Sequence, residues 1–305
     1  MADRNLPRIT NIWSRIAGEA EGKCETQVVI EANAPFAYKL ANSSRPGTLC
    51  IDTQARAVMP EGTIPVYDGL LKTVALQQID ARTARLTLEW EYSGPYRVAT
   101  CNTLPARLIV CLDRAPLEAI LAGKRIMLDP GHGGTDRGHR GPVNLWEKDV
   151  VLITAAKLKE LLTGASGEVL FTRTGDGEID GPARIRMAKE HGADVFVSLH
   201  TGFAPQTWVG GNRVLYNPGE PRSALLAELV RDALREQVSL KGKALRPDPL
   251  YLGHLGNIPG ITVEIVTISN WVEEGLLRMP RFHEKTALGI FNGILRWLVK
   301  MNDPG

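Results

Sequence analysis

The sequence predicts two domains: an N-terminal all-β sandwich and a C-terminal α/β domain with a largely parallel sheet flanked by helices. A chain of 305 residues is long enough for two domains of ordinary size, each with its own core. Residues 1–115 contain short alternating segments between turn residues, whereas residues 124–305 alternate apolar strands with helical segments. Residues 116–123 are expected to connect the two as a linker or a short helix.

Six segments of the first domain alternate between apolar and polar side chains, as strands with one buried face do. They are residues 27–31, 36–40, 48–52, 85–90, 96–99 and 106–112. Turn residues separate them, for example Asn-Ser-Ser-Arg-Pro-Gly at 42–47. Many short strands at a spacing of roughly 8–12 residues predict a β-sandwich.

In the second domain, short apolar segments typical of strands alternate with segments whose apolar residues recur at the helical spacing of about 3.6 residues. Strands are expected at 125–128, 168–172, 193–199, 213–216 and 261–266, and helices at 147–162, 182–191, 223–237 and 281–299. Because active sites in such sheets lie beyond the carboxyl ends of the strands, side chains that follow a strand are the first candidates for function.

The composition is that of a globular protein, with 44% hydrophobic and 23% charged residues. A net charge of +2 predicts no nucleic-acid partner. No apolar run reaches about 18 residues, so no membrane span is expected. The N-terminus has no apolar signal-peptide core, which leaves two alternatives open: the protein stays inside the cell, or an export signal has been replaced by a start Met.

The four cysteines, Cys24, Cys50, Cys101 and Cys111, all lie in the first domain and none is near a histidine. No Cys-x-x-Cys pair occurs, so a thiolate zinc site is not expected. Two disulfides or four free thiols are both compatible with the spacing, and free thiols are slightly favoured.

Four residues in the second domain predict a catalytic zinc site. His132 lies in a glycine-rich loop after a strand, Glu147 begins a helix, and His200 ends a second strand. Each alone has an ordinary structural explanation, such as a loop histidine or a carboxylate at a helix start. Glu264 lies inside an apolar strand, where an ionised carboxylate needs a metal, a cation or a raised pKa. Together they match a site with three ligands, an open position for water and a nearby base.

The remaining histidines are weaker candidates. His139 lies in the same polar loop as His132, and His254 precedes the Glu264 strand, so both are candidates for contact with substrate. His191 and His283 lie at helix ends and are expected on the surface.

Three other polar residues have two interpretations each. Arg173 and Arg184 either orient substrate carboxylates or form structural ion pairs with Asp176 or Asp194, and the ion pairs are favoured. Asp129 either hydrogen-bonds a ligand histidine or stabilises its turn.

The candidate residues lie in motifs through which residues 124 to about 299 resemble the zinc-dependent N-acetylmuramoyl-L-alanine amidases of the type-three family. The matching motifs are Asp-Pro-Gly-His-Gly-Gly at 129–134, Glu-Lys-Asp at 147–149, Thr-Arg at 172–173 with Asp176 and Arg184, Ala-Asp at 193–194 with Phe196, Ser198 and His200, and Pro259 with Glu264 and Ser-Asn at 269–270. The resemblance implies that His132, Glu147 and His200 bind Zn²⁺ and that Glu264 is the catalytic carboxylate. Gly202 departs from the Asn, and Val-Thr at 266–267 from the Gly-Phe, that the family often has.

The first domain resembles, more loosely, an AMIN domain. The resemblance rests on Pro46 before the strand at 48–52, on the segment 71–78, on the strand at 85–89 and on the last strand to Leu112. It implies binding to the cell wall, and an unrelated β-sandwich is the alternative.

The resemblance implies hydrolysis of the amide between N-acetylmuramic acid and L-Ala in peptidoglycan, at the cell wall or in the periplasm if an export signal precedes this chain. A cytoplasmic location stays open. The alternatives are a peptidoglycan-binding protein without activity and a zinc peptidase that cleaves within the stem peptide. Some relatives carry an extra helix that plugs the cleft between the second His and the last Glu. Here the interval contains one predicted helix, at 223–237, which predicts an open site.

Overall fold

The computed structural model describes residues 6–18, 24–43 and 45–302. The chain divides into two compact units, Met1–Ala119 and Ile120–Gly305, which are described separately. Most of the segment expected as a linker or a short helix is helix α1 (Ala115–Leu121), and Leu117 and Leu121 on it are fully buried. The division between the units therefore falls within a helix and not in an exposed linker.

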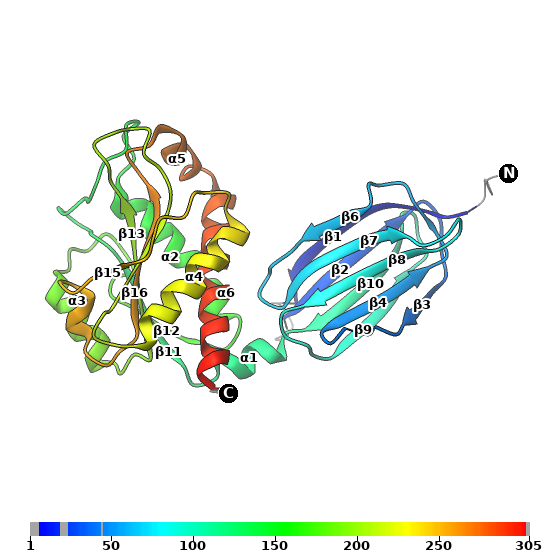
Figure 1. The fold of residues 1–305 in the computed structure, drawn as a ribbon, viewed down its shortest axis with the longest axis horizontal. Helices are drawn as coiled ribbons and strands as arrows, with labels where there is room; N and C mark the ends of the chain where they lie inside the picture. The colour runs from blue at the N-terminus through cyan, green and yellow to red at the C-terminus, as the bar shows by residue number, and fades with distance from the viewer. Residues whose placement is uncertain (1–5, 19–23, 44, 303–305) are drawn as a thin grey trace. The chain divides into compact units, whose positions relative to one another are not determined.

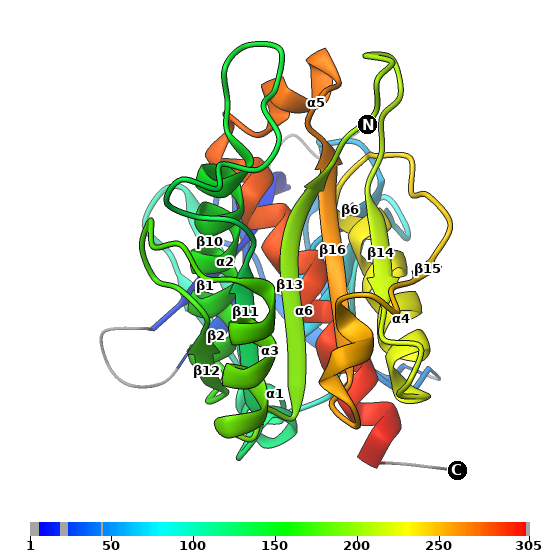
Figure 2. The same ribbon diagram turned by 90° about the vertical axis from the view of Figure 1, so that its left-hand side faces the viewer.

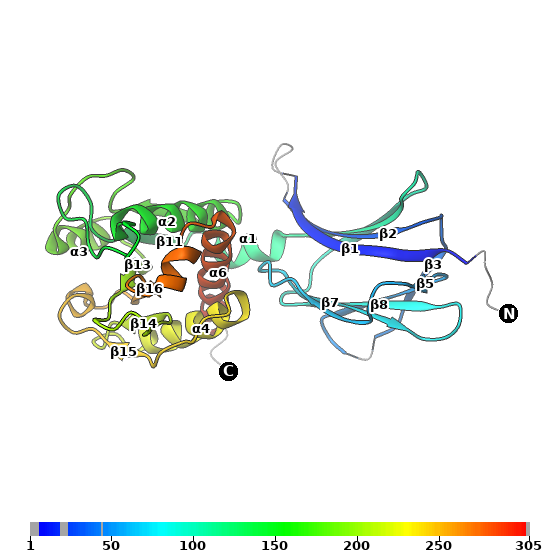
Figure 3. The ribbon, with the colours of Figure 1, turned by 90° about the horizontal axis from the view of Figure 1, so that it is seen from above.

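The first unit contains two five-stranded sheets that lie as two layers, with β1 and β2 in one and β7 and β8 in the other (Figure 1, Figure 3). One sheet has the order β5-β1-β2-β10-β9 and the other β3-β4-β8-β7-β6. The strands are β1 (Arg8–Ala17), β2 (Glu25–Ala32), β3 (Tyr38–Ala41), β4 (Thr48–Thr53), β5 (Arg56–Ala57), β6 (Gly62–Pro65), β7 (Leu71–Gln78), β8 (Ala84–Trp90), β9 (Tyr96–Cys101) and β10 (Ala106–Asp113). All six predicted strands are present.

Alternate residues of both sheets form the core of this unit. Ile30 and Leu108 from one sheet and Leu86 and Leu88 from the other have no exposed surface. The sequence did not predict β1, because a register shift near its start breaks the alternation on which that prediction depends. The four cysteines are free thiols.

The second unit is built on one six-stranded sheet with the order β12-β11-β13-β16-β14-β15 (Figure 2). Its strands are β11 (Arg125–Pro130), β12 (Glu168–Phe171), β13 (Val195–Gly202), β14 (Arg213–Tyr216), β15 (Arg246–Pro247) and β16 (Gly260–Thr267). The pairs from β12 through β16 are parallel, and β14 runs antiparallel to β16. The expected α/β fold with a largely parallel sheet is confirmed.

Helices cover both faces of this sheet (Figure 2). On one face α2 (Glu147–Thr163) packs on β11 and β13, α4 (Arg222–Gln237) on β14 and β16, and α6 (Pro280–Asn302) packs on both helices. α3 (Gly181–Glu190) and the 3₁₀ helix η2 (Leu252–Leu255) contribute to a separate apolar cluster with β11 and β13. In the described part of the chain, no helix is both long and apolar enough to cross a membrane.

The prediction for His283 is wrong. His283 was expected on the surface, but it is almost completely buried between α6 and α2. Its Nδ1 lies 2.7 Å from the Thr154 hydroxyl and its Nε2 lies 2.7 Å from the Leu277 carbonyl oxygen. Burial lowers the pKa of His283, so the ring is neutral and connects α6 to α2 by its contact with Thr154.

Candidate metal centre

His132 lies in the loop that leaves β11 at the carboxyl edge of the sheet. Its backbone φ is 61°, an uncommon value for a residue with a side chain. Gly131 allows this loop to approach β13, because a Cβ there would lie 2.2 Å from the His200 ring. His132 and His200 consequently lie with ring centroids 4.9 Å apart.

Glu147 is the first residue of α2 and its side chain is completely buried. Its Oε1 accepts a hydrogen bond from the Thr201 backbone N–H at 2.7 Å, and its Oε2 accepts one from the His139 backbone N–H at 2.9 Å. These two donors fix the carboxylate in a single position between the histidine rings.

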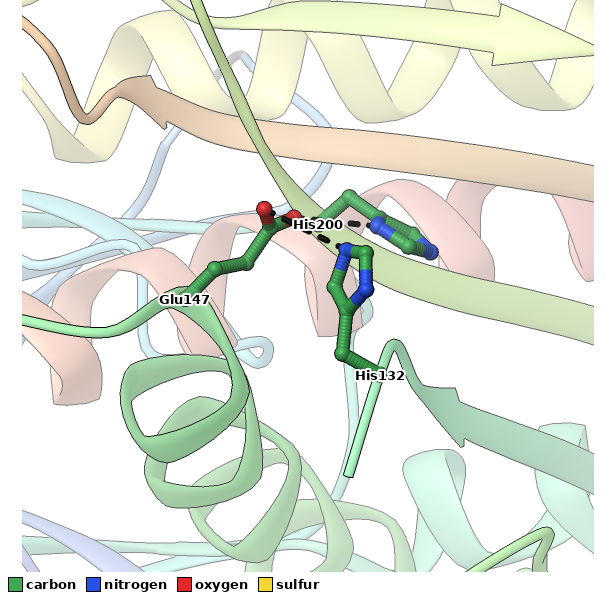
Figure 4. Close-up of side chains that lie close together, drawn as sticks. All are labelled: His132, Glu147 and His200. Atoms are coloured by element: carbon green, nitrogen blue, oxygen red, sulfur yellow. Dashed lines mark hydrogen bonds and ion pairs between the residues drawn. The ribbon is translucent and has the colours of Figure 1, made fainter. Parts of the chain in front are cut away.

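The three side chains converge from a loop, a helix and a strand (Figure 4). Glu147 Oε2 lies 3.3 Å from His132 Nε2, and Glu147 Oε1 lies 3.0 Å from His200 Nδ1. Ligand atoms from all three residues lie within 4.8 Å of one another. The sequence placed these residues in one site, and the structure brings them together.

The electrostatics of this group favour a cation. Burial alone would raise the pKa of Glu147, but hydrogen bonds with His132, His139 and His200 outweigh it and the pKa is strongly lowered. Burial alone would lower the pKa of His132, but Glu147 and Asp136 outweigh it and the pKa is raised. An ionised carboxylate held between imidazole nitrogens in a buried site is suited to a divalent cation.

Glu264 lies on β16, opposite His200 in the pairing of β13 with β16. The next pair is Gly202 with Thr267, so β16 carries one extra residue beside the site, as in a β-bulge. The Glu264 side chain is 19% exposed, and its Oε2 lies 3.7 Å from Arg213 Nη1. Glu264 therefore has the cation that the sequence required of a carboxylate in an apolar strand, and it borders the candidate centre.

Comparison with known proteins identifies the family. The family described as N-acetylmuramoyl-L-alanine amidase matches residues 126–296, more than half of the chain. The chain belongs to the N-acetylmuramoyl-L-alanine amidase family. Peptidoglycan amidase activity is the activity of this family.

Two curated members of the family are similar to this chain. The germination-specific N-acetylmuramoyl-L-alanine amidase of Bacillus subtilis is 31% identical over 205 residues, which cover 62% of this chain and 86% of that protein. The amidase AmiC of Neisseria meningitidis is 29% identical over 361 residues, which cover 90% of this chain and 87% of that protein. The second similarity extends through most of the first unit.

Two solved amidase structures have a similar fold. AmiC2 of Nostoc punctiforme has a TM-score of 0.55 and 28% identity, covering 58% of this chain and 99% of that chain. The CwlD amidase of Clostridioides difficile has a TM-score of 0.56 and 29% identity, covering 58% and 99%. The α/β fold of the second unit is thus the fold of these amidases.

In this amidase, Asp136 has the role that the sequence analysis considered for Asp129. Both carboxylate oxygens of Asp136 lie 2.8 Å from His132 Nδ1, so that nitrogen donates and Nε2 is left to face Glu147. Asp129 instead accepts hydrogen bonds from Thr172, Arg184, Ser198 and Tyr251 beneath the loop. The signal for Asp136 was its spacing of four residues from His132.

Arg173 and Arg184 hold the backbone of the His132 loop in place. Both are buried, and their donors bind backbone carbonyls of Pro130, Gly131 and His132. Arg184 forms a structural ion pair, as the favoured interpretation expects, but its partner is Asp129 at 2.7 Å and not Asp176 or Asp194. The donors of Arg173 bind backbone carbonyl oxygens.

Of the two weaker histidine candidates, His139 lies beside Glu147 and His254 does not. His139 Nδ1 lies 2.9 Å from Glu147 Oε2, and the ring stacks on Phe203, so this half-exposed side chain is at the rim of the centre. His254 is exposed on η2, next to Leu255, which packs on the first residue of β16. His254 is therefore at the amino end of that strand, away from the histidines.

The interval between His200 and Glu264 contains β14, α4, β15 and η2. Its α-helix packs on the sheet and on α6, and η2 contacts α3 and β16. No second α-helix is present in this fully described interval, as the prediction of an open cleft requires.

Helix α5 (Trp271–Leu276), which the sequence did not predict, ties two loops of the rim together. Buried Glu273 accepts a hydrogen bond from the backbone N–H of Gly211, in the loop after β13. Buried Glu274 accepts hydrogen bonds from the backbone N–H groups of Val143 and Leu145, in the loop before Glu147. Two adjacent carboxylates thus position the loop after β13 and the loop before Glu147.

Gly138→Ala is expected to weaken metal binding and lower activity, each by about tenfold or more, the size of effect seen when a group supporting a metal ligand is lost. A Cβ at this position would lie 2.5 Å from His132 Cδ2 and 2.8 Å from Glu147 Oε2. Gly123→Ala is the matched control, because Gly123 has a similar φ of 69° but nothing within 4 Å of its Cβ position. Zinc titration of both variants tests this, and equal losses in the two would contradict it.

Proposed function

We propose that the chain is a zinc-dependent hydrolase of the amide between N-acetylmuramic acid and the L-Ala of the peptidoglycan stem peptide. His132, Glu147 and His200 hold Zn²⁺, and Glu264 moves the proton. The observation that carries this proposal is the convergence of the three side chains next to a carboxylate on the neighbouring strand.

The donor set fits the metal. Two imidazole nitrogens and one carboxylate oxygen form a ligand set found in catalytic zinc sites, which keep a further position open. Gly131 and Gly138 leave the space that the rings and the carboxylate need. Zinc bound there supplies a positive charge that polarises the amide carbonyl and lowers the pKa of water.

Residues of the chain supply the remaining chemistry. Glu264 accepts the proton of the attacking water and passes it to the nitrogen of the leaving amine. Arg213 Nη1 lies 3.7 Å from Glu264 Oε2, on the strand next to β16. Asp136 holds the His132 ring in the orientation in which Nε2 faces the metal.

We also propose that the first unit is a separate AMIN-like domain. In this proposal it binds peptidoglycan and thereby places the enzyme at its substrate. Two observations support this: its two-layered β structure, and the similarity to the Neisseria meningitidis amidase, which covers 90% of this chain. The proposed site of action is the cell wall or the periplasm.

Mass analysis of digested peptidoglycan tests the function. The expected products are intact stem peptides with a free amino group on L-Ala, together with muramic acid that has lost its peptide. Fragments cut within the stem would instead identify a zinc peptidase. Binding to peptidoglycan without any product, despite bound zinc, would identify a binding protein.

A further inference from the structure

Four polar side chains follow one another across the carboxyl edge of the sheet, one from each successive strand or the loop after it. His132 follows β11, His200 lies on β13, Glu264 on β16 and Arg213 on β14. Because β14 runs antiparallel to β16, its first residue, Arg213, lies at the same edge as Glu264. Neighbouring strands are about 4.8 Å apart, so Arg213 lies one strand beyond the proton-transfer group, on the side away from the metal.

The guanidinium N–H donors of Arg213 are available to a ligand. Its nearest acidic group in the described part of the chain is Glu264 at 3.7 Å, which is longer than a hydrogen bond. The side chain is 29% exposed, and its guanidinium has five N–H donors in a planar arrangement that matches a carboxylate.

A second cation lies next to Arg213. The Lys243 backbone N–H donates to the Asn212 carbonyl, and Lys243 Nζ donates to the Thr267 hydroxyl at 2.6 Å. Burial first and then the charge of Arg213 lower the pKa of Lys243, so a bound anion would stabilise its charged form.

The direction of the substrate follows from the proposed function, on which this inference rests. Glu264 gives its proton to the leaving amine, so the peptide side of the scissile amide must lie on the Glu264 side of the metal. A peptide that continues in this direction passes Arg213 within about two residues, because extended chain spans about 3.5 Å per residue.

We propose that Arg213, with Lys243 next to it, forms an anion subsite for a carboxylate on the stem-peptide residue that follows L-Ala. The subsite distinguishes stems that carry a free carboxylate there from stems in which this group is a carboxamide. A carboxamide forms no ion pair and offers one acceptor oxygen in place of two, so it loses the bidentate, charge-assisted contact.

The test compares two muramoyl peptides that differ only in this group, carboxylate or carboxamide. We expect wild-type kcat/KM to be about tenfold higher for the carboxylate, the size of effect of a charge-assisted hydrogen bond. Arg213→Met should remove this preference, because it should lower kcat/KM for the carboxylate substrate about tenfold more than kcat/KM for the carboxamide substrate. Arg246→Met, an exposed arginine on neighbouring β15, is the control and should keep the preference.

Each outcome separates this inference from the function on which it rests. Cleavage of neither substrate by the wild type would reject the proposed function itself. Cleavage of both with no preference would reject the subsite alone. An equal loss on both substrates in Arg213→Met would show that Arg213 acts only through Glu264 and would also overturn the subsite. A preference that disappears only in Arg213→Met supports it.

Discussion

Replacing Glu264 by Gln is expected to lower turnover by about 10²–10⁴-fold, the usual contribution of a positioned acid or base. Gln has nearly the same shape but cannot accept the proton of the attacking water. Glu264 is not among the three converging ligand side chains, so the variant should bind as much zinc as the wild type. Activity on peptidoglycan and metal content, measured on the same preparation, test both halves of this expectation.

Glu284→Gln is the control, because Glu284 is exposed on α6. It should leave both activity and zinc content unchanged. Full activity in Glu264→Gln would assign the proton transfer to another group. A loss of zinc together with activity would make Glu264 a ligand.

Replacing Asp129 by Asn is expected to lower the free energy of unfolding of the second unit by about 3–5 kcal/mol, the usual cost of removing one partner of a buried ion pair. Asp129 has no exposed surface and pairs with Arg184 at 2.7 Å, and Arg184 in turn holds the carbonyl oxygens of Pro130 and His132. The variant leaves a buried guanidinium without its charge partner. Unfolding midpoints in guanidinium, measured with a chelator present, keep metal binding out of the comparison.

The control for this variant is the exposed pair of Lys157 with Glu160 on α2. Glu160→Gln should change stability by less than about 0.5 kcal/mol, as expected for a surface ion pair on a helix. Similar midpoints for Asp129→Asn and Glu160→Gln would show that the buried pair does not stabilise the loop.

The same pair predicts a pH dependence. Burial alone would raise the pKa of Asp129, but Arg184 and the hydroxyls of Ser198 and Thr172 outweigh it and the pKa is lowered. A carboxyl whose pKa is lower in the folded state contributes stability above the pKa of the unfolded chain, about 3.9, and loses it as the pH falls further. The stability difference between wild type and Asp129→Asn should therefore be constant from about pH 7 to 5 and shrink below about pH 4.

Much of the second unit could be predicted from the sequence because its elements have strong periodic patterns. The strands that carry His200 and Glu264 are mostly apolar, and the rule that sites lie at carboxyl ends of strands grouped the candidate metal ligands. Glu264 was informative for a physical reason, since a carboxylate in an apolar strand needs a compensating charge. Arg213 is that charge, but only the pairing of β14 with β16 reveals it.

The residues that the sequence misplaced depend on tertiary contacts. His283 looked like a surface residue because nothing in its own helix shows that Thr154 of α2 faces it. Arg173 and Arg184 were expected to pair mainly with Asp176 or Asp194, but the loop after β11 supplies backbone carbonyl oxygens that accept hydrogen bonds from both side chains. Helix α5 is only six residues long, too short to show a helical period.

The most direct test of the central claim is the zinc content of the purified protein and of its His132→Ala and His200→Ala variants after dialysis against a defined zinc buffer. If His132, Glu147 and His200 hold one ion, the wild type should retain about one zinc per chain. Each alanine variant should retain far less at the same free zinc, with the fold preserved by circular dichroism. A wild type that binds no zinc, or variants that bind it as tightly as the wild type, would contradict the account.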